Sequence, residues 1–248
     1  MKIIISPAKK MRTDTDTYPV KGAPALLDRT RRIMEYMKAL TYPEAKKLWK
    51  CNDKIAQENF ERFRYMDLEK NLTPAVISYD GIQYQYMAPG VFTRDELEYI
   101  DAHLNILSGF YGVARPFDGV TPYRLEMQAK ASVEKAKDLY EFWGDSIYQC
   151  VMQDNADRTV INLASKEYSK CVEQYLTQQD TFITCVFGEL SGEKVIQKGT
   201  QAKMARGEMV RYMAAHNVTE VSMLKNFSEL GYTFDAERSN DREYVFLK

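Results

Sequence analysis

The sequence predicts an α+β fold in which helices pack around one mixed β-sheet, within a single domain that spans residues 1–248. Three observations lead to this prediction. Short apolar runs with strand character alternate with longer segments whose apolar residues recur at helical spacing. Some neighbouring strands are close enough for hairpins, whereas others are separated by helices and need crossovers. No repeat, low-complexity tract or linker marks a boundary, and 45% hydrophobic residues can supply one sizeable core.

The first part of the chain supplies one strand and three helices. Residues 2–5 form a short buried strand that ends at Ser6-Pro7. Over 25–40 the apolar residues follow one helical face, with arginines on the other. Thr41 can cap a second helix, because a proline lies in its first turn and a glutamate three residues on. Asn52 caps a third helix to about Phe63, after a very tight connection.

The middle of the chain continues this alternation. Residues 76–78 form a predicted strand, closed by turn residues 79–81. Thr93-Arg-Asp-Glu is another capping box and starts a helix to about His103. Asp138 caps a helix whose apolar residues keep helical spacing as far as Val151. Residues 159–163 form a second central strand, broken by Ala164-Ser165.

The last part of the chain adds strand pairs on either side of a helix. Residues 182–190 and 193–197, joined around Ser191-Gly192, form a predicted hairpin. Thr200 caps a helix to about His216, and a shorter helix follows near 219–226. Residues 232–234 then pair with 244–247. Hairpins beside helix-containing crossovers favour a mixed sheet.

Residues 104–127 are the most informative stretch of the chain. Glycines and prolines interrupt a run dense in aromatic residues, and charged side chains occur within it at Arg115, Arg124 and Glu126. Glycine permits close backbone approach, while proline fixes φ and removes a donor. Such a segment is typical of a shaped wall that holds charged side chains on stiff backbone. The alternative is a buried turn with internally satisfied salt bridges.

Charge and cysteine content limit the class of protein. The net charge of -1 excludes proteins whose whole surface is basic, but it permits a local basic cleft. The start of the chain lacks the apolar run of a signal peptide, and no apolar stretch approaches the ~20 residues that span a bilayer. We therefore expect a cytoplasmic protein without membrane contact. The four cysteines form no C-x-x-C pair and are expected to be reduced thiols.

Small and polar residues follow two of the predicted strands. Ser6-Pro-Ala-Lys9 comes directly after the first strand, and Asn162-Leu-Ala-Ser165 ends another. Ligands gather at the carboxyl ends of strands in α/β architectures, so both segments are candidates to open onto one cleft. The alternative is two ordinary surface turns. The residues expected to line the cleft are Ser6, Tyr111, Asn162 and Ser165.

Five cations form a compact anion-binding pocket if the fold brings them together. Lys203 and Arg206 share one face of a predicted helix, although solvated helix faces often have the same pattern. Arg124 and Glu126 point the same way in an extended segment, so they either neutralise each other or form a polar site with Arg115. The five cations are Lys9, Arg115, Arg124, Lys203 and Arg206.

Recognisable catalytic motifs are absent. The sequence contains no P-loop, no strand-linked G-x-G-x-x-G and no H-E-x-x-H. Its two histidines, His103 and His216, lie near predicted helix C-termini, where histidine most often interacts with the helix end. We therefore predict no metal site, cofactor or Ser-His-Asp triad. The carboxylates available for acid–base chemistry are Asp80, Asp118 and Glu126.

Seven motifs, in order and in register along nearly the whole chain, resemble the bacterial YaaA family of peroxide stress proteins. No single motif is diagnostic, but the ordered set is highly specific. The motifs lie at residues 6–9, 107–118, 122–127, 138–145, 162–165, 203–207 and 226–235.

The resemblance implies a protein linked to peroxide stress and to limiting damage from free intracellular iron. It also implies DNA binding through a positively charged cleft and a helix-hairpin-helix element on an unusual α+β fold. Residues 41–63 best fit that element, although no glycine lies between the two helices to offer backbone N–H groups to phosphate. Lys50, Asn52 and Lys54 are the candidates for those contacts.

These observations leave two main hypotheses and a third, a protein-interaction role. In the first, the protein binds duplex DNA, bent or damaged DNA included, and protects it or helps to repair it. The phosphate contacts would come from Lys9, Lys54, Arg115, Arg124, Lys203 and Arg206. In the second, the protein is an enzyme that acts on a nucleobase, abasic DNA or a small anionic metabolite. Lys9 would then be an amine nucleophile, with Glu126 or Asp118 as proton carrier.

Overall fold

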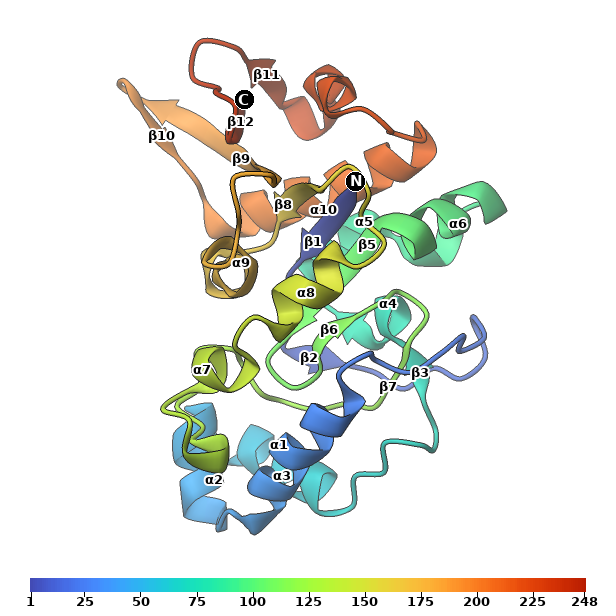
Figure 1. Ribbon diagram of the computed structural model, residues 1–248, viewed down its shortest axis with the longest axis vertical. Helices are drawn as coiled ribbons and strands as arrows, with labels where there is room; N and C mark the ends of the chain where they lie inside the picture. The colour runs from blue at the N-terminus through green and yellow to red at the C-terminus, as the bar shows by residue number, and fades with distance from the viewer.

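A mixed β-sheet forms the centre of the computed structural model, which describes residues 1–248 (Figure 1). Its strands are β1 Lys2–Ile5, β5 Leu104–Ser108, β6 Gly112–Ala114, β8 Thr159–Leu163, β9 Thr181–Ser191, β10 Lys194–Ile196, β11 Thr233–Asp235 and β12 Glu243–Leu247. They lie in the order β11-β12-β9-β8-β1-β5-β6, and β10 pairs with β9. The inner pairings are parallel and the outer ones antiparallel, which confirms the predicted mixed sheet.

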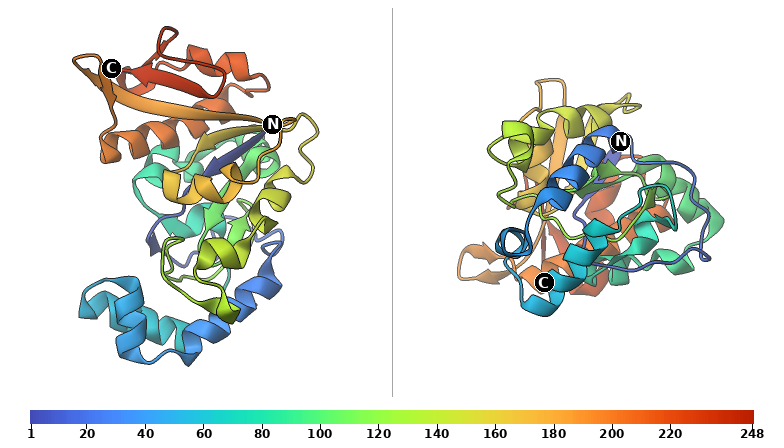
Figure 2. Two further views of the ribbon diagram at one scale, coloured as in Figure 1. Left: turned by 60° about the vertical axis from the view of Figure 1, so that its left-hand side comes forward. Right: turned by 90° about the horizontal axis from the view of Figure 1, so that it is seen from below.

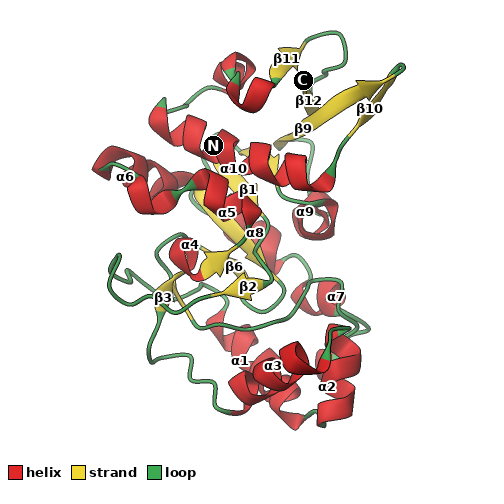
Figure 3. Ribbon diagram, turned by 180° about the vertical axis from the view of Figure 1, so that it is seen from behind, coloured by secondary structure: helices red, strands yellow, loops and turns green.

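Helices cover both faces of this sheet. The α-helices of the molecule are α1 Leu27–Ala39, α2 Tyr42–Trp49, α3 Asp53–Arg64, α4 Ala75–Ser78, α5 Ile82–Met87, α6 Arg94–His103, α7 Leu139–Trp143, α8 Ser146–Met152, α9 Lys166–Glu173 and α10 Gly199–Ala215. Helices α8 and α9 lie over the face seen in Figure 1, while α5, α6 and α10 cover the opposite face, seen in Figure 3. Burial on both faces explains why β1 contains three consecutive isoleucines, residues 3–5, with no exposed surface.

Helices α1, α2 and α3 form an extension beyond the sheet (Figure 1). The predicted helix starts are confirmed here: Thr41 and Glu44 form a capping box, and the Asn52 side chain accepts a hydrogen bond from the Ile55 N–H. Lys50 ends α2 in the left-handed region, with φ of 48°. The two helices are therefore joined by a short turn in which a lysine takes the conformation that glycine usually supplies.

The structure corrects two of the predicted elements. Residues 76–78 are part of α4, flanked by two-residue strands β3 Thr73–Pro74 and β4 Tyr79–Asp80, which pair with β7 Gly119–Val120 and β2 Lys10–Met11. The helix predicted from Asp138 to Val151 is two helices, because Gly144 breaks it at φ of 53°. The hairpin of β9 with β10 and the pairing of β11 with β12 are both confirmed.

No helix combines the length and apolar composition that crossing a membrane requires.

Two of the four cysteines are expected to resist chemical modification in the folded protein. Cys171 and Cys185 are buried, and burial raises the pKa of each thiol to about 12. A thiol reacts as the thiolate, so both should be slow. Titration with a chromogenic disulfide should therefore detect at most Cys51 and Cys150 in the native protein and all four in denaturant. Rapid reaction of three or more native thiols would contradict this.

Candidate functional site

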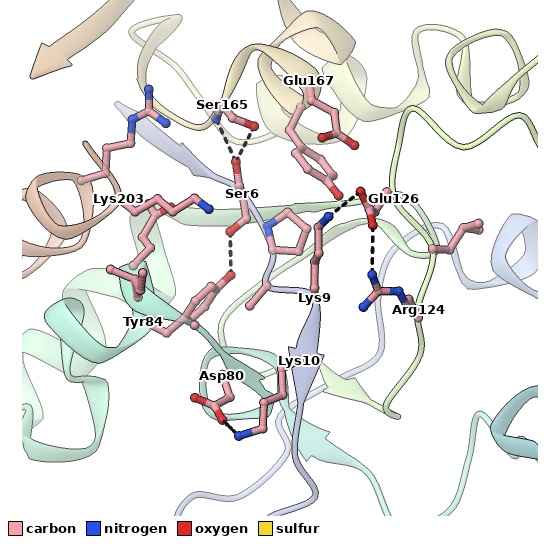
Figure 4. A pocket seen from close by; sticks show the side chains of 18 of the residues that line it. Ser6, Lys9, Lys10, Asp80, Tyr84, Arg124, Glu126, Ser165, Glu167 and Lys203 are labelled. Atoms are coloured by element: carbon pink, nitrogen blue, oxygen red, sulfur yellow. Dashed lines mark hydrogen bonds and ion pairs between the residues drawn. The ribbon is translucent and has the colours of Figure 1, made fainter. Parts of the chain in front are cut away.

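A cavity of about 380 Å³ opens where strands β1 and β8 end (Figure 4). The two strands are parallel neighbours, so their carboxyl ends meet at one edge of the sheet. There the Ser165 N–H donates to the Ser6 Oγ at 2.8 Å, and the two hydroxyl oxygens lie 3.2 Å apart. The structure thus brings together the two strand ends that we expected from the sequence to open onto one cleft.

Charged side chains dominate the polar lining of the cavity. Five are basic: Lys9, Lys10, Arg124, Lys203 and Arg206. Three are acidic: Asp80, Glu126 and Glu167. The lining therefore carries an excess of two positive charges, although the chain as a whole carries a net charge of -1.

Glu126 holds two of these cations on one side of the cavity. Lys9 Nζ lies 3.0 Å from Glu126 Oε2, and Arg124 Nη2 lies 3.5 Å from Glu126 Oε1. Arg124 and Glu126 thus point the same way and neutralise each other, with Lys9 as the third member. The Lys9 side chain is 63% exposed, so this pair contributes little to stability. It leaves the Lys9 ammonium accessible to a ligand.

The segment that carries Arg124 and Glu126 is held rigidly by its neighbours. A Cβ at Gly109 would lie 2.6 Å from the Leu125 carbonyl oxygen, so only glycine permits this close approach. The Trp49 indole N–H of α2 donates to the Arg124 carbonyl oxygen. The hydroxyl group of Tyr123 forms buried hydrogen bonds with two other hydroxyl groups, and burial raises the pKa of Tyr123 to about 12. The close packing supports the rigid wall of the first interpretation, while the Arg124–Glu126 pair is an internal salt bridge of the kind that the alternative predicts.

Lys203 and Arg206 reach the cavity from helix α10. This helix packs against α5 so closely that a Cβ at Gly207 would lie 2.1 Å from the Gln83 carbonyl oxygen. Lys203 is exposed, whereas the Arg206 Nε is buried without a hydrogen-bond partner, and burial lowers the pKa of Arg206. Neither cation forms an ion pair within the protein. They are therefore available to an anion that enters the cavity.

Glu167 belongs to the site but was not singled out from the sequence. It lies in the first turn of α9, two residues beyond Ser165, and its carboxylate accepts a hydrogen bond from the Gln128 N–H at 3.2 Å. Burial raises the pKa of Glu167, and the nearby Glu126 carboxylate adds to that increase. The sequence offered one signal for Glu167, a carboxylate close after the polar residues that end a strand. Acidic residues in the first turn of a helix are common, however, because they interact favourably with the helix dipole.

Because the pKa of Glu167 is raised, replacing this residue with neutral glutamine should stabilise the folded protein, and the gain should depend on pH. Because folding favours the protonated carboxyl, the stabilising contribution of this group is present below pH 4.5 and lost as pH rises through the folded pKa. Glu167→Gln should therefore raise the urea midpoint at about pH 7, and the difference from the wild type should shrink towards about pH 4. The exposed Glu193→Gln is the control. An unchanged difference across this range would contradict the prediction.

Several predicted site residues lie away from the cavity. Arg115 faces Asp154, with Nη2 3.8 Å from the Asp154 carboxylate, and does not join the other four cations. Asp118 is buried and accepts a hydrogen bond from the Arg115 N–H at 2.7 Å, so it does not accompany Lys9 as Glu126 does. The remaining three are Tyr111 and Asn162, which are buried in the core, and Lys54, which is exposed on α3.

No group of three or more His, Cys, Asp or Glu side chains is arranged to hold a metal ion. The cavity offers instead cations for an anionic group and carboxylates for hydrogen-bond donors.

Comparisons with known proteins match nearly the whole chain. A family model described as peroxide stress protein YaaA matches residues 1–238. A UPF0246 protein of Lachnoclostridium phytofermentans is 56% identical over 248 residues, which cover 100% of this chain and 96% of the relative. A UPF0246 protein of Agathobacter rectalis is 53% identical over 246 residues, with 99% and 98% covered. One of Pediococcus pentosaceus is 52% identical over 248 residues, with 100% and 98% covered.

Proposed function

The chain belongs to the family of peroxide stress protein YaaA, and from this premise we propose that it binds DNA through the cations around its cavity. The observation that carries the proposal is the gathering of Lys9, Arg124, Lys203 and Arg206 around one opening. We call these four residues the cationic rim. They come from separate parts of the sequence, and two of them have no acidic partner.

Phosphate contacts from such a rim would give binding that depends on salt and on DNA shape more than on base sequence. The net charge of -1 disfavours binding by the rest of the surface, so affinity should be concentrated at the rim. A role in protecting or repairing DNA under peroxide stress follows from combining this binding with the family. The connection with iron stays a prediction from the resemblance.

The pair of helices α2 and α3 supports an extension of this DNA site. Trp49 at the end of α2 contacts the backbone of Arg124, so the pair adjoins the wall of the cavity. Figure 2 (left) shows the pair projecting to the same side of the molecule as α10. Lys50, at the end of α2, and Lys54, in the first turn of α3, are both exposed. We propose that this pair acts as the helix-hairpin-helix and contacts a neighbouring stretch of the same DNA backbone.

Fluorescence anisotropy of a labelled duplex across a salt series tests the proposal. Lys203→Ala should weaken binding and lower the slope of log affinity against log salt by about one, as expected for a lost phosphate contact. Lys225→Ala is the matched control, because Lys225 is exposed but lies over the rings of Phe234 and Tyr244. Equal losses in both variants, or no binding by the wild type, would overturn the proposal.

The contact of Lys9 with Glu126 favours a second candidate function, chemistry at an abasic site. Lys9 would pass a proton to Glu126, and its amine would attack the aldehyde carbon of the opened sugar. Loss of water from that adduct would then give an imine. Borohydride reduces such an imine to a stable amine, so trapping should yield a covalent protein–DNA adduct that Lys9→Ala lacks. Absence of any adduct from the wild type would exclude this chemistry.

A further inference from the structure

The two sides of the cavity differ in chemistry. Figure 4 shows Lys203 on one side and Glu126 with Glu167 on the other, with Ser6 between them. Arg206 lies one helical turn beyond Lys203 on α10, so the two unpaired cations come from the same side. We call this side the cationic end and the side of Glu126 and Glu167 the acidic end.

The cationic end is suited to a phosphate group. Its two positive charges match the excess of two over the whole cavity lining, because Lys10 pairs with Asp80 and the acidic end is balanced by Lys9 and Arg124. The buried Arg206 Nε lacks a partner, so an anion that reached it would satisfy a donor that the protein leaves unsatisfied. Ser165, at the start of α9, also lines the cavity and adds the positive end of that helix.

The acidic end is suited to a group with N–H donors. Glu126 and Glu167 offer carboxylate oxygens, the acceptors that pair with amino groups of nucleobases. The charges of Lys9 and Arg124 keep this end neutral overall, so it needs no cationic ligand.

The space between the ends matches a ligand of nucleotide size. The wall includes Pro7, Ala8 and Ile82, whose apolar surface suits a sugar or the face of a base. A volume of about 380 Å³ lies in the range of cavities that hold small molecules of drug size. An inorganic phosphate or a single amino acid would occupy one end and leave the other open.

We propose that the cavity binds one nucleotide unit, with its phosphate at Lys203 and Arg206 and its base edge at Glu126 and Glu167. The unit comes either from a free mononucleotide or from DNA, as a terminal or extruded nucleotide. This inference deepens the proposed function and rests on it only for the DNA source.

Isothermal titration calorimetry with the four deoxynucleoside 5′-monophosphates and with inorganic phosphate tests the cavity directly. At least one mononucleotide should bind about tenfold or more tightly than phosphate, because only it reaches both ends. Lys203→Ala should weaken both ligands. Glu126→Gln should weaken the mononucleotide, which loses an acceptor, but should not weaken phosphate, because Lys9 and Arg124 lose their neutralising carboxylate. The matched controls, Arg211→Ala on the same helix and Glu193→Gln on the β9–β10 turn, should bind as the wild type does.

A duplex with 2-aminopurine at a mismatch tests the DNA source, because this base becomes more fluorescent when it leaves the stack. A rise with the wild type that is lost when Glu126→Gln is itself saturated with the duplex would place the base of bound DNA in the cavity. Mononucleotide binding without that rise would identify free nucleotide as the source. Mononucleotide binding without any DNA binding would contradict the proposed function but leave this inference standing. DNA binding with neither mononucleotide preference nor fluorescence rise would overturn the inference alone.

Discussion

Replacing Arg206 with methionine is expected to weaken DNA binding and, at the same time, to raise the free energy of unfolding by about 1 kcal/mol. The buried Nε has no partner, so folding removes this N–H donor from water without a compensating hydrogen bond. Methionine keeps much of the side-chain volume without that cost. Binding sites are often destabilised in this way, because groups held ready for a ligand are unsatisfied without it. Urea unfolding and anisotropy with labelled duplex measure the two effects.

Arg211→Met is the control for this variant, because Arg211 is exposed on the same helix and does not line the cavity. It should leave both DNA affinity and unfolding nearly unchanged. A fall in the stability of Arg206→Met would show that Arg206 serves the packing of α10. Unchanged DNA affinity in that variant would remove Arg206 from the cationic rim.

Gly207→Val is expected to lower the free energy of unfolding by about 3 kcal/mol, through overpacking between α10 and α5. A Cβ at this position would lie 2.1 Å from the Gln83 carbonyl oxygen, and the obstacle is backbone that cannot turn aside. Helix α10 must then shift, and Lys203 and Arg206 shift with it. Binding should therefore fall in the part of the population that remains folded, as anisotropy at low temperature would detect.

Gly199→Ala provides the matched control on the same helix. No atom lies within 4 Å of a Cβ at Gly199, so alanine should be neutral or slightly stabilising. Equal effects of the two substitutions in urea unfolding would contradict the claim that close packing at Gly207 positions the cations.

The local signals in the sequence predicted most of the fold. The capping boxes at Thr41 and Thr93 and the cap at Asn52 located helix starts because side chains fix those backbone donors locally. The strand predicted over residues 76–78 was wrong, because a short apolar run has no periodicity that separates a strand from a buried helical turn. The sequence does not predict the break at Gly144, because one glycine is tolerated inside many helices. In the structure its positive φ ends the helix.

The site was predictable where neighbours in sequence are neighbours in space. Lys9 follows β1 directly, and Arg124 and Glu126 share an extended segment. Arg115 was misplaced because the chain turns between it and Arg124, so the two face different parts of the molecule. The approach of α10 to this edge depends on packing between helices distant in sequence, which no local pattern specifies.

The most direct test of the central claim is to map the lysines that DNA protects, without altering any residue. Acetylation of the free protein and of the duplex complex, followed by mass spectrometry, gives the rate at each lysine. DNA bound across the cationic rim should slow acetylation of Lys9 and Lys203, and of Lys54 if the α2–α3 pair takes part, while Lys225 reacts as before. Unchanged rates at Lys9 and Lys203 in a DNA-saturated sample would contradict the claim.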